Sequence, residues 1–126
     1  MRSKLTALSG PQLDIMKVVW RLGEATVRDV YEELRTQRTI AYTTVMTTMK
    51  NMKAKGHLKK RNEGRAFVYS ATATESRMLK RIVGDFIDRV FNGSAEPLLV
   101  HLVKEQRLTE KDLKKIQKMI QEQEKH

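Results

Sequence analysis

Short polar side chains recur at helical spacing in one segment of the sequence. They are Thr44, Thr47, Thr48 and Asn51, followed one turn later by Lys55. At about 100° per residue, these positions share one face of a helix. Asn pairs with adenine through two hydrogen bonds, Thr bonds base edges or touches a thymine methyl, and Lys reaches phosphates. The pattern therefore predicts a helix that reads bases in a DNA major groove.

The rest of this helix divides into two further surfaces. Its inward face is apolar and comprises Ala41, Val45, Met49 and Met52. A second polar edge comprises Thr43, Lys50 and Lys53 and is predicted to face the phosphate backbone. The alternative is a threonine-rich surface helix without a ligand. Thr and Asn are poorer helix formers than Ala or Leu, and that alternative gives no reason for four of them in one stripe.

Basic residues concentrate in the same region. Residues 1–71 hold 14 basic and 6 acidic side chains, whereas residues 72–126 hold 11 and 9. Between residues 50 and 65 the only acid is Glu63. Such a distribution suits a phosphate backbone, although a solvated lysine-rich surface would look the same by charge alone. The predicted phosphate contacts are Thr43, Lys50, Lys53, Lys55, Lys59, Lys60, Arg61 and Arg65.

The elements needed to present these side chains can be read from capping residues and periodicity. Ser9 and Gly23 bound a first helix, Thr26 caps a short second one, and Gly56 ends a third over residues 41–55. Residues 57–61 and 65–71 then form two strands around a turn at residues 62–64. Three helices followed by a hairpin predict a winged helix-turn-helix domain. The fold class is therefore mostly α with a small β-hairpin.

The second half of the sequence predicts two helices with one apolar side, beginning near Thr74 and Thr109. Between them, a short and almost wholly apolar helix is predicted to begin near Pro97. We expect a DNA-binding domain over residues 1–72 and a helical dimerisation domain over residues 73–126, because about fifty residues bury little apolar surface alone. Packing back on the N-terminal domain in a monomer is the alternative. The predicted interface comprises Leu79, Ile82, Val83, Phe86, Val90, Leu98, Leu99, Leu102, Leu113, Ile116 and Ile120.

Length and composition limit the other function classes. The 126-residue chain has a formal charge of +10 and no cysteine, which excludes disulfides and thiolate chemistry. The histidines His57, His101 and His126 lack neighbouring ligands, so we expect no metal, no cofactor and no catalytic residues; zinc held across a dimer is the remaining metal alternative. We also expect a cytoplasmic protein without membrane insertion, because no apolar run approaches spanning length.

The position of Tyr42 has two alternatives, and two functions other than DNA binding are also considered. Tyr42 reaches a phosphate or packs on the first helix, and Trp20 belongs to the core. The second function class is a dimeric helical adaptor whose basic face binds an acidic protein or membrane surface. RNA binding has less support because no aromatic platform is evident. An adaptor has no need for Thr44, Thr47, Thr48 and Asn51.

The sequence resembles the penicillinase repressor (BlaI/MecI) family over nearly the whole chain. The residues that carry the resemblance are 13–20 (LDIMKVVW), 26–30 (TVRDV), 41–49 (AYTTVMTTM), 55–58 (KGHL) and 64–69 (GRAFVY). The resemblance implies a dimeric winged-helix repressor on inverted-repeat operators, with the recognition helix at residues 41–55, the wing at 58–70 and a C-terminal dimer. It also implies a signal-transducing protease as a candidate partner.

Two departures separate this sequence from known branches of that family. Antibiotic-responsive members are cleaved at an Asn-Phe bond, and the matching candidate cleavage positions here are His101 and Leu102. Copper-responsive members use a C-terminal cysteine motif, which a chain without cysteine cannot provide. The operator sequence, the regulated genes, the direction of regulation and the inducing signal are therefore left open.

Overall fold

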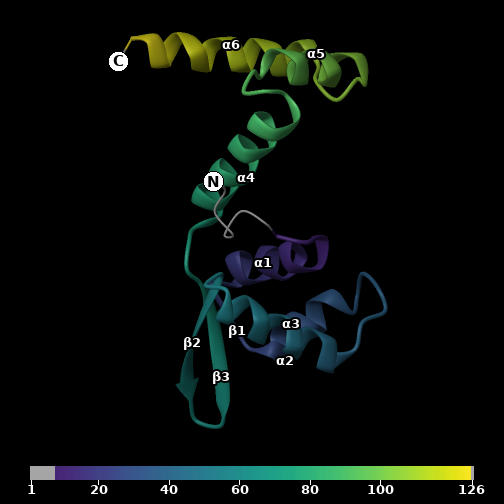
Figure 1. The fold of residues 1–126 in the computed structure, drawn as a ribbon, viewed down its shortest axis with the longest axis vertical. Helices are drawn as coiled ribbons and strands as arrows, with labels where there is room; N and C mark the ends of the chain where they lie inside the picture. Colours follow the sequence, from purple (N-terminus) through teal and green to yellow (C-terminus); the bar gives the residue numbers. More distant parts are fainter. Residues whose placement is uncertain (1–7, 126) are drawn as a thin grey trace. The chain divides into compact units, whose positions relative to one another are not determined.

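The computed structural model describes residues 8–125, which contain six helices and a small three-stranded antiparallel sheet (Figure 1). The elements are α1 (Gly10–Leu22), β1 (Glu24–Ala25), α2 (Val27–Leu34), α3 (Tyr42–Ala54), β2 (Leu58–Glu63), β3 (Ala66–Ala71), α4 (Glu75–Val90), α5 (Glu96–Lys104) and α6 (Glu110–Glu124). Three helices precede a hairpin, as predicted. The prediction of a mostly helical fold with a small hairpin is confirmed.

The chain forms two compact units, with the boundary inside α4. Unit 1 extends through Val83, and unit 2 begins at Gly84. Unit 1 therefore holds α1 to α3, the sheet and the first part of α4. The functional boundary between residues 72 and 73 stays a prediction, because compactness does not tell which residues bind DNA or a second chain.

The first two helices begin where their capping residues predict. Ser9 accepts a hydrogen bond from the Gln12 backbone, and Thr26 accepts one from the Asp29 backbone. In both cases the side chain of the residue three positions later, Gln12 or Asp29, accepts a hydrogen bond from the backbone N–H of the capping residue. These bonds satisfy backbone donors that have no partner within the helix. Gly23 ends α1 at φ 84°, a conformation that other residues adopt at a cost.

The sheet holds one strand that the sequence did not predict. Glu24 and Ala25, which lie between the first two predicted helices, form β1 and pair with Ser70 and Tyr69 of β3. The strand order is β1-β3-β2, so β3 is central. A two-residue strand has no periodicity of its own and forms only because β3 supplies hydrogen-bond partners.

The hairpin turn is also shifted from its predicted position. We expected the turn at residues 62–64, but Asn62 and Glu63 pair within the ladder and Glu63 lies opposite Ala66. Gly64 and Arg65 therefore form the turn, with Gly64 at φ 63°. Only the glycine adopts the positive φ, so the turn centres on it.

The core of unit 1 joins the three helices to the base of the hairpin. α3 contributes Val45, Met49 and Met52, all fully buried. The remaining buried apolar residues of this cluster are Ile15, Met16, Val18, Val19, Ala25, Val30, Leu34, Leu58 and Tyr69. Ala41 was predicted to join this face, but it is exposed and serves as the N-cap of α3. The core thus fixes one face of α3 over about two turns, from Val45 to Met52.

Trp20 has its predicted position at the core, whereas Tyr42 is not a buried residue packed on the first helix. Trp20 is partly buried against the core, and its indole Nε1 donates to the Ala73 carbonyl at 3.0 Å, which agrees with a structural role. Tyr42 is 38% exposed and does not pack on α1 as a buried residue. Its ring meets that of Tyr31 on α2 edge-on, with centroids 5.5 Å apart.

The helices of unit 2 keep their predicted starts and leave much apolar surface open. Thr109 accepts from the Asp112 backbone and caps α6. Asn92 and Gly93, which follow α4, both have positive φ. No residue of α5 or α6 is buried. Every helix within residues 8–125 is too short or too polar to cross a bilayer.

His57 is the buried polar residue of unit 1 and lies between α3 and β2. Its side chain is 1% exposed, and neither ring nitrogen has a hydrogen-bond partner among the described residues. Its backbone is well held, since the N–H donates to Met52 and the carbonyl accepts from Thr72. Burial, together with the charge of Lys55, lowers the pKa of His57.

We expect this imidazole to make the stability of unit 1 depend on pH. The folded state resists protonation, so the unfolded state takes up its proton first as the pH falls through about 6.5. The free energy of unfolding is therefore highest, as far as His57 determines it, above that pH and decreases below it. Urea titrations at pH 5.5 and 7.5 should show a larger loss for the wild type than for His57→Leu. Equal losses in both proteins would contradict the assignment.

Candidate nucleic-acid interface

The helix α3 is buried on one face and open on the other. Thr44, Thr47 and Asn51 are exposed, about 120° around the helix from Val45, Met49 and Met52. No acidic residue lies between Tyr42 and Lys55. The predicted base-reading face is therefore accessible, and the packing beneath it fixes its position.

Thr48 differs from its neighbours in the stripe. It is half-buried, and its Oγ1 donates to the Thr44 carbonyl at 2.7 Å. This is the back-bond that Thr commonly makes inside helices. Its hydroxyl proton is thus engaged, and the oxygen alone is left to accept a hydrogen bond from a ligand. Of the four predicted base-contacting residues, Thr48 is the least available donor.

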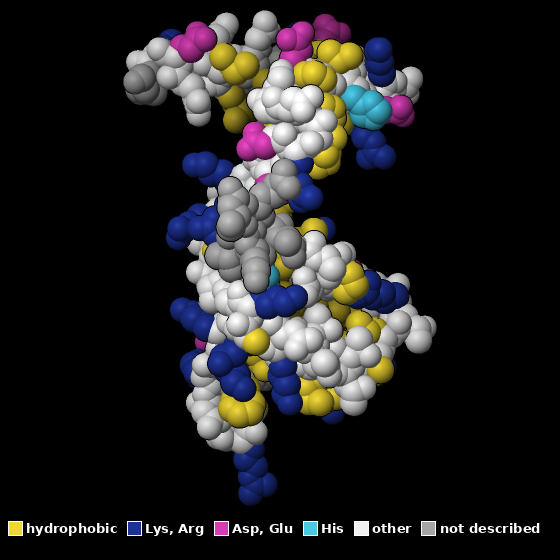
Figure 2. Space-filling model, in the orientation of Figure 1, with side chains coloured by type: hydrophobic (Ala, Val, Ile, Leu, Met, Phe, Trp, Pro, Cys, Tyr) yellow, Lys and Arg dark blue, Asp and Glu magenta, His cyan; other side chains and the backbone are white. Residues whose placement is uncertain are grey.

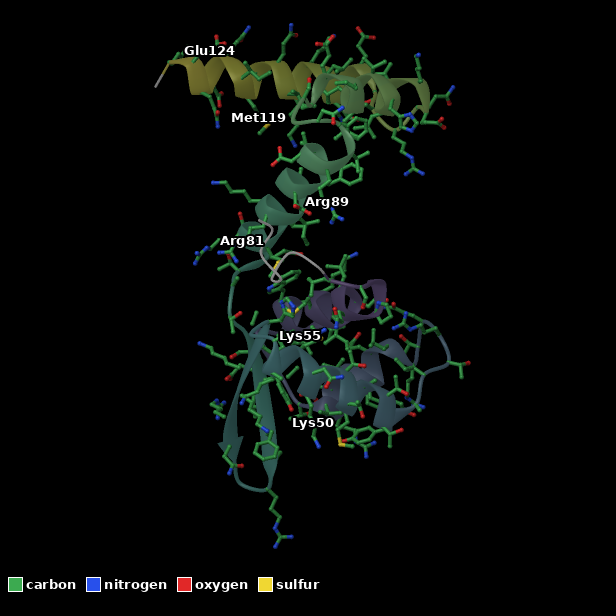
Figure 3. All side chains as sticks on the ribbon, in the orientation of Figure 1. Lys50, Lys55, Arg81, Arg89, Met119 and Glu124 are labelled. Atoms are coloured by element: carbon green, nitrogen blue, oxygen red, sulfur yellow. The ribbon has the colours of Figure 1, made fainter. Side chains whose placement is uncertain are left out.

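The lysines of α3 surround the stripe on different sides. Lys50 and Lys53 are exposed on the edge that also carries Thr43, whereas Lys55 follows the helix as its C-cap. Lys50 and Lys55 leave α3 in different directions (Figure 3). An anionic group along one side of α3 would therefore contact Thr43, Lys50 and Lys53. Lys55 would contact a different anionic group.

The strand pairing separates the basic residues of the hairpin onto two faces. Lys60 is opposite Tyr69 in the ladder, and Tyr69 is buried in the core that α3 shares. Lys59 and Arg61 alternate with Lys60 and therefore project from the other face. The three cations do not line one surface, contrary to what their adjacency in the sequence suggests.

Arg61 is held by two carboxylates. Its Nε and Nη2 donate to Glu24 at 3.0 and 3.1 Å, and its Nη1 lies 2.6 Å from Glu63. The hydrogen bonds and charge of Arg61 lower the pKa of Glu24, and the two carboxylates raise the pKa of Arg61. This cation is neutralised locally, so the hairpin offers less free positive charge than its composition indicates.

Among residues 8–125, no carboxylate pairs with the cations on the inner face and in the turn of the hairpin. Lys60 Nζ lies 4.0 Å from the centre of the Phe67 ring, a cation–π contact that leaves the ammonium hydrogens available. Phe67 is 48% exposed. Arg65 is in the exposed turn. Figure 2 shows basic side chains spread over the hairpin and the helices of unit 1.

The structure adds Arg28 and Glu24, which sequence reasoning missed. Arg28 stands over the Tyr42 ring at 5.3 Å, beside the N-terminus of α3, and lies 3.6 Å from Glu32. The edge-on pair of Tyr42 and Tyr31 fixes that ring. Helical spacing could have suggested the contact with Glu32, but nothing in the sequence places Arg28 against a residue of α3.

The residues predicted for dimerisation are mostly exposed apolar side chains on helices. Leu79, Ile82 and Val83 belong to the part of α4 in unit 1, and the others belong to unit 2. The exposed members are Leu79, Val83, Phe86, Val90, Leu99, Leu113 and Ile120, and the half-buried members are Ile82, Leu98, Leu102 and Ile116. Exposed apolar side chains of this kind are typical of helices that bind another protein chain.

The comparisons with known proteins agree with this geometry. The family model described as penicillinase repressor matches residues 8–122. The penicillinase repressor of Bacillus licheniformis is 25% identical over 94% of this chain and 93% of its own length. The transcriptional regulator BlaI of Mycobacterium tuberculosis is 31% identical over 80% of this chain and 75% of its own. The solved DNA-binding domain of the repressor BlaI aligns at 33% identity and a TM-score of 0.53, covering 60% of this chain and 92% of that domain.

We expect Thr47→Ala to leave unit 1 as stable as the wild type, or more stable by about 0.5 kcal/mol. Thr47 is exposed and contributes nothing to the core, while Ala is the better helix former. The matched control is Met49→Ala, two residues on and fully buried, which should cost about 3 kcal/mol. Chemical denaturation measures both; a loss above about 1 kcal/mol for Thr47→Ala would mean that its side chain serves the fold.

Proposed function

Because the chain belongs to the penicillinase repressor family, we propose that it represses transcription by binding operator DNA through unit 1. This membership confirms the resemblance, the DNA-binding repressor function and the prediction that the protein is not an enzyme. The alternative function, a dimeric helical adaptor that binds an acidic protein or a membrane surface, is not favoured by this membership. The observation that carries the proposal is the exposed stripe of Thr44, Thr47 and Asn51 on a helix whose other face is buried.

Base reading is assigned to the open face of α3. Short side chains let a helix backbone approach the base edges closely. The amide of Asn51 can donate to adenine N7 and accept from the adenine N6 amino group. Thr44 and Thr47 bond base edges or contact thymine methyl groups. Thr48 is kept in this set as an acceptor only, because its proton is engaged with the Thr44 carbonyl.

Phosphate contacts are assigned to exposed residues on either side of this face. They comprise Thr43, Lys50, Lys53, Lys55, Lys59, Lys60 and Arg65. Lys60 and Arg65 are supported by their positions on the inner face and the turn of the hairpin. Arg61 is left out of this set, because both sides of its guanidinium are bound by carboxylates. These contacts position the protein and make its affinity depend on salt.

We further propose that two copies pair through the apolar faces of α4, α5 and α6 and bind an inverted repeat. The support is the exposure of Phe86, Val90 and Ile120, which are about half exposed in the single chain. A symmetric protein pair reads a symmetric DNA site, one unit per half-site. The cytoplasm is the compartment proposed for this activity.

We also propose that a signal-transducing protease releases the protein from DNA. The candidate positions His101 and Leu102 lie inside α5, where Leu102 is half-buried. Proteases bind extended backbone, so α5 would have to unwind locally before cleavage at this bond. Incubation of the intact protein with a candidate protease, followed by mass spectrometry, would test this route.

The experiment that tests the function is selection from a random pool of DNA duplexes. The protein should enrich one sequence, and that sequence should be an inverted repeat if two copies bind. Enrichment of an asymmetric site would remove the symmetric assembly but keep DNA binding. A pool without any enriched sequence would contradict base reading by α3.

We expect Asn51→Ala to weaken binding to the selected duplex by roughly 5- to 100-fold, because one bidentate base contact is worth about 1–3 kcal/mol. Binding to a random duplex should not change. Lys60→Ala, the matched control for charge, should weaken both and lower the slope of log K against log salt by about 0.9. Fluorescence anisotropy at several salt concentrations measures all four values. Equal losses on both duplexes for Asn51→Ala would contradict its base-reading role.

We expect the wild type to sediment as a dimer at micromolar concentration and Ile120→Glu to weaken the dimer at least about tenfold, because a carboxylate would be buried at an apolar contact. The control is Lys118→Glu, an exposed charge change on the same helix. Sedimentation velocity distinguishes the states. A wild-type monomer, or equal effects of both substitutions, would count against this interface.

A further inference from the structure

Arg61 makes a contact in unit 1 that DNA binding through free cations does not explain. On the hairpin strand β2, it donates two parallel hydrogen bonds to Glu24 at 3.0 and 3.1 Å. Glu24 belongs to β1, in the connection between α1 and α2, which is 37 residues away in sequence. Glu63 closes the third side of the guanidinium at 2.6 Å.

The sheet geometry shows that this contact spans the whole sheet. The strand order is β1-β3-β2, so Glu24 and Arg61 are on the two outer strands and the central strand lies between them. Glu24 is opposite Ser70, and Ser70 is opposite Lys59, two residues from Arg61. Glu24, Arg61 and Glu63 therefore share the face of the sheet opposite the buried Tyr69. One face of the sheet is held by the core and the other by this ion cluster.

The arrangement is specific to an arginine. A planar guanidinium donates to a carboxylate through two parallel bonds, which fixes orientation as well as distance, and lysine cannot reproduce this fork. The groups are about half exposed, so the ion pairs contribute little to global stability. Their effect is expected on the local mobility of the hairpin, whose outer residues have no core beneath them.

We propose that Arg61 is a positioning residue, which locks the hairpin to the α1–α2 connection through Glu24, and is not a phosphate contact. The proposal rests on the proposed function, because the locked hairpin is the element that carries Lys60 and Arg65 to the DNA backbone. Thr26, which caps α2, follows β1 directly, so the lock ties the hairpin to the start of the helix pair. The orientation of the hairpin relative to α3 is then set before DNA arrives.

The first test compares Arg61→Ala, Arg61→Lys and Lys60→Ala on a random-sequence DNA duplex across salt concentrations. A locked hairpin predicts that both Arg61 variants bind roughly 3- to 10-fold more weakly at an unchanged salt slope, because no phosphate contact is lost. Lys60→Ala should lower the slope by about 0.9. A slope lowered equally by Arg61→Ala, or wild-type binding by Arg61→Lys, would overturn the proposal, since a phosphate contact needs only the charge.

The second test uses Glu24→Gln. Removing a negative charge near DNA should strengthen binding if only charge matters, whereas loss of the lock should weaken it. Amide hydrogen exchange of the free protein gives a readout without DNA: β2 and β3 should exchange faster in Glu24→Gln and Arg61→Lys than in the wild type. Unchanged exchange in both variants would overturn the lock. Failure of the wild type to bind DNA would overturn the proposed function instead, with the exchange result still deciding the lock.

Discussion

The structure depends on burying one face of α3 while leaving Thr44, Thr47 and Asn51 on another face exposed. Val45, Met49 and Met52 are fully buried and fix the helix against the core. A helix held only by its ends or by charges would move relative to the hairpin, and base contacts depend on placement within fractions of an ångström. The same constraint explains why a stripe of poor helix formers is tolerated, because core packing supplies the stability that Thr and Asn do not.

Charge is arranged around this helix by neutralising some cations and leaving others free. Arg61, Arg21 and Arg38 are paired with carboxylates of other elements of unit 1 and hold those elements together. Lys50 and Lys53 on α3 and Lys60 on β2 have no carboxylate partner in the described part of the chain. The formal excess of positive charge therefore overstates the charge offered to a ligand, while its placement follows the open face.

The sequence predicts the structure where the determining interactions are local. Caps such as Ser9 with Gln12 and Thr26 with Asp29 act over three residues, and the faces of α3 follow from helical spacing alone. β1 and the contact between Glu24 and Arg61 were missed because they depend on pairing between segments far apart in the chain. The hairpin turn moved to Gly64 and Arg65 because ladder register overrides the turn preference of Asn62. The stripe was recognised, but the engaged hydroxyl of Thr48 was visible only in three dimensions.

The short connection between α1 and α2 has little freedom to vary in length. Gly23 turns the chain at positive φ, the next two residues hydrogen-bond to the central strand, and Thr26 must then start a helix. An inserted residue would shift Ala25 out of register and turn it from the core to solvent. Relatives that diverge widely in side chains should therefore keep this connection at constant length, and insertions should collect instead at the segment between α2 and α3.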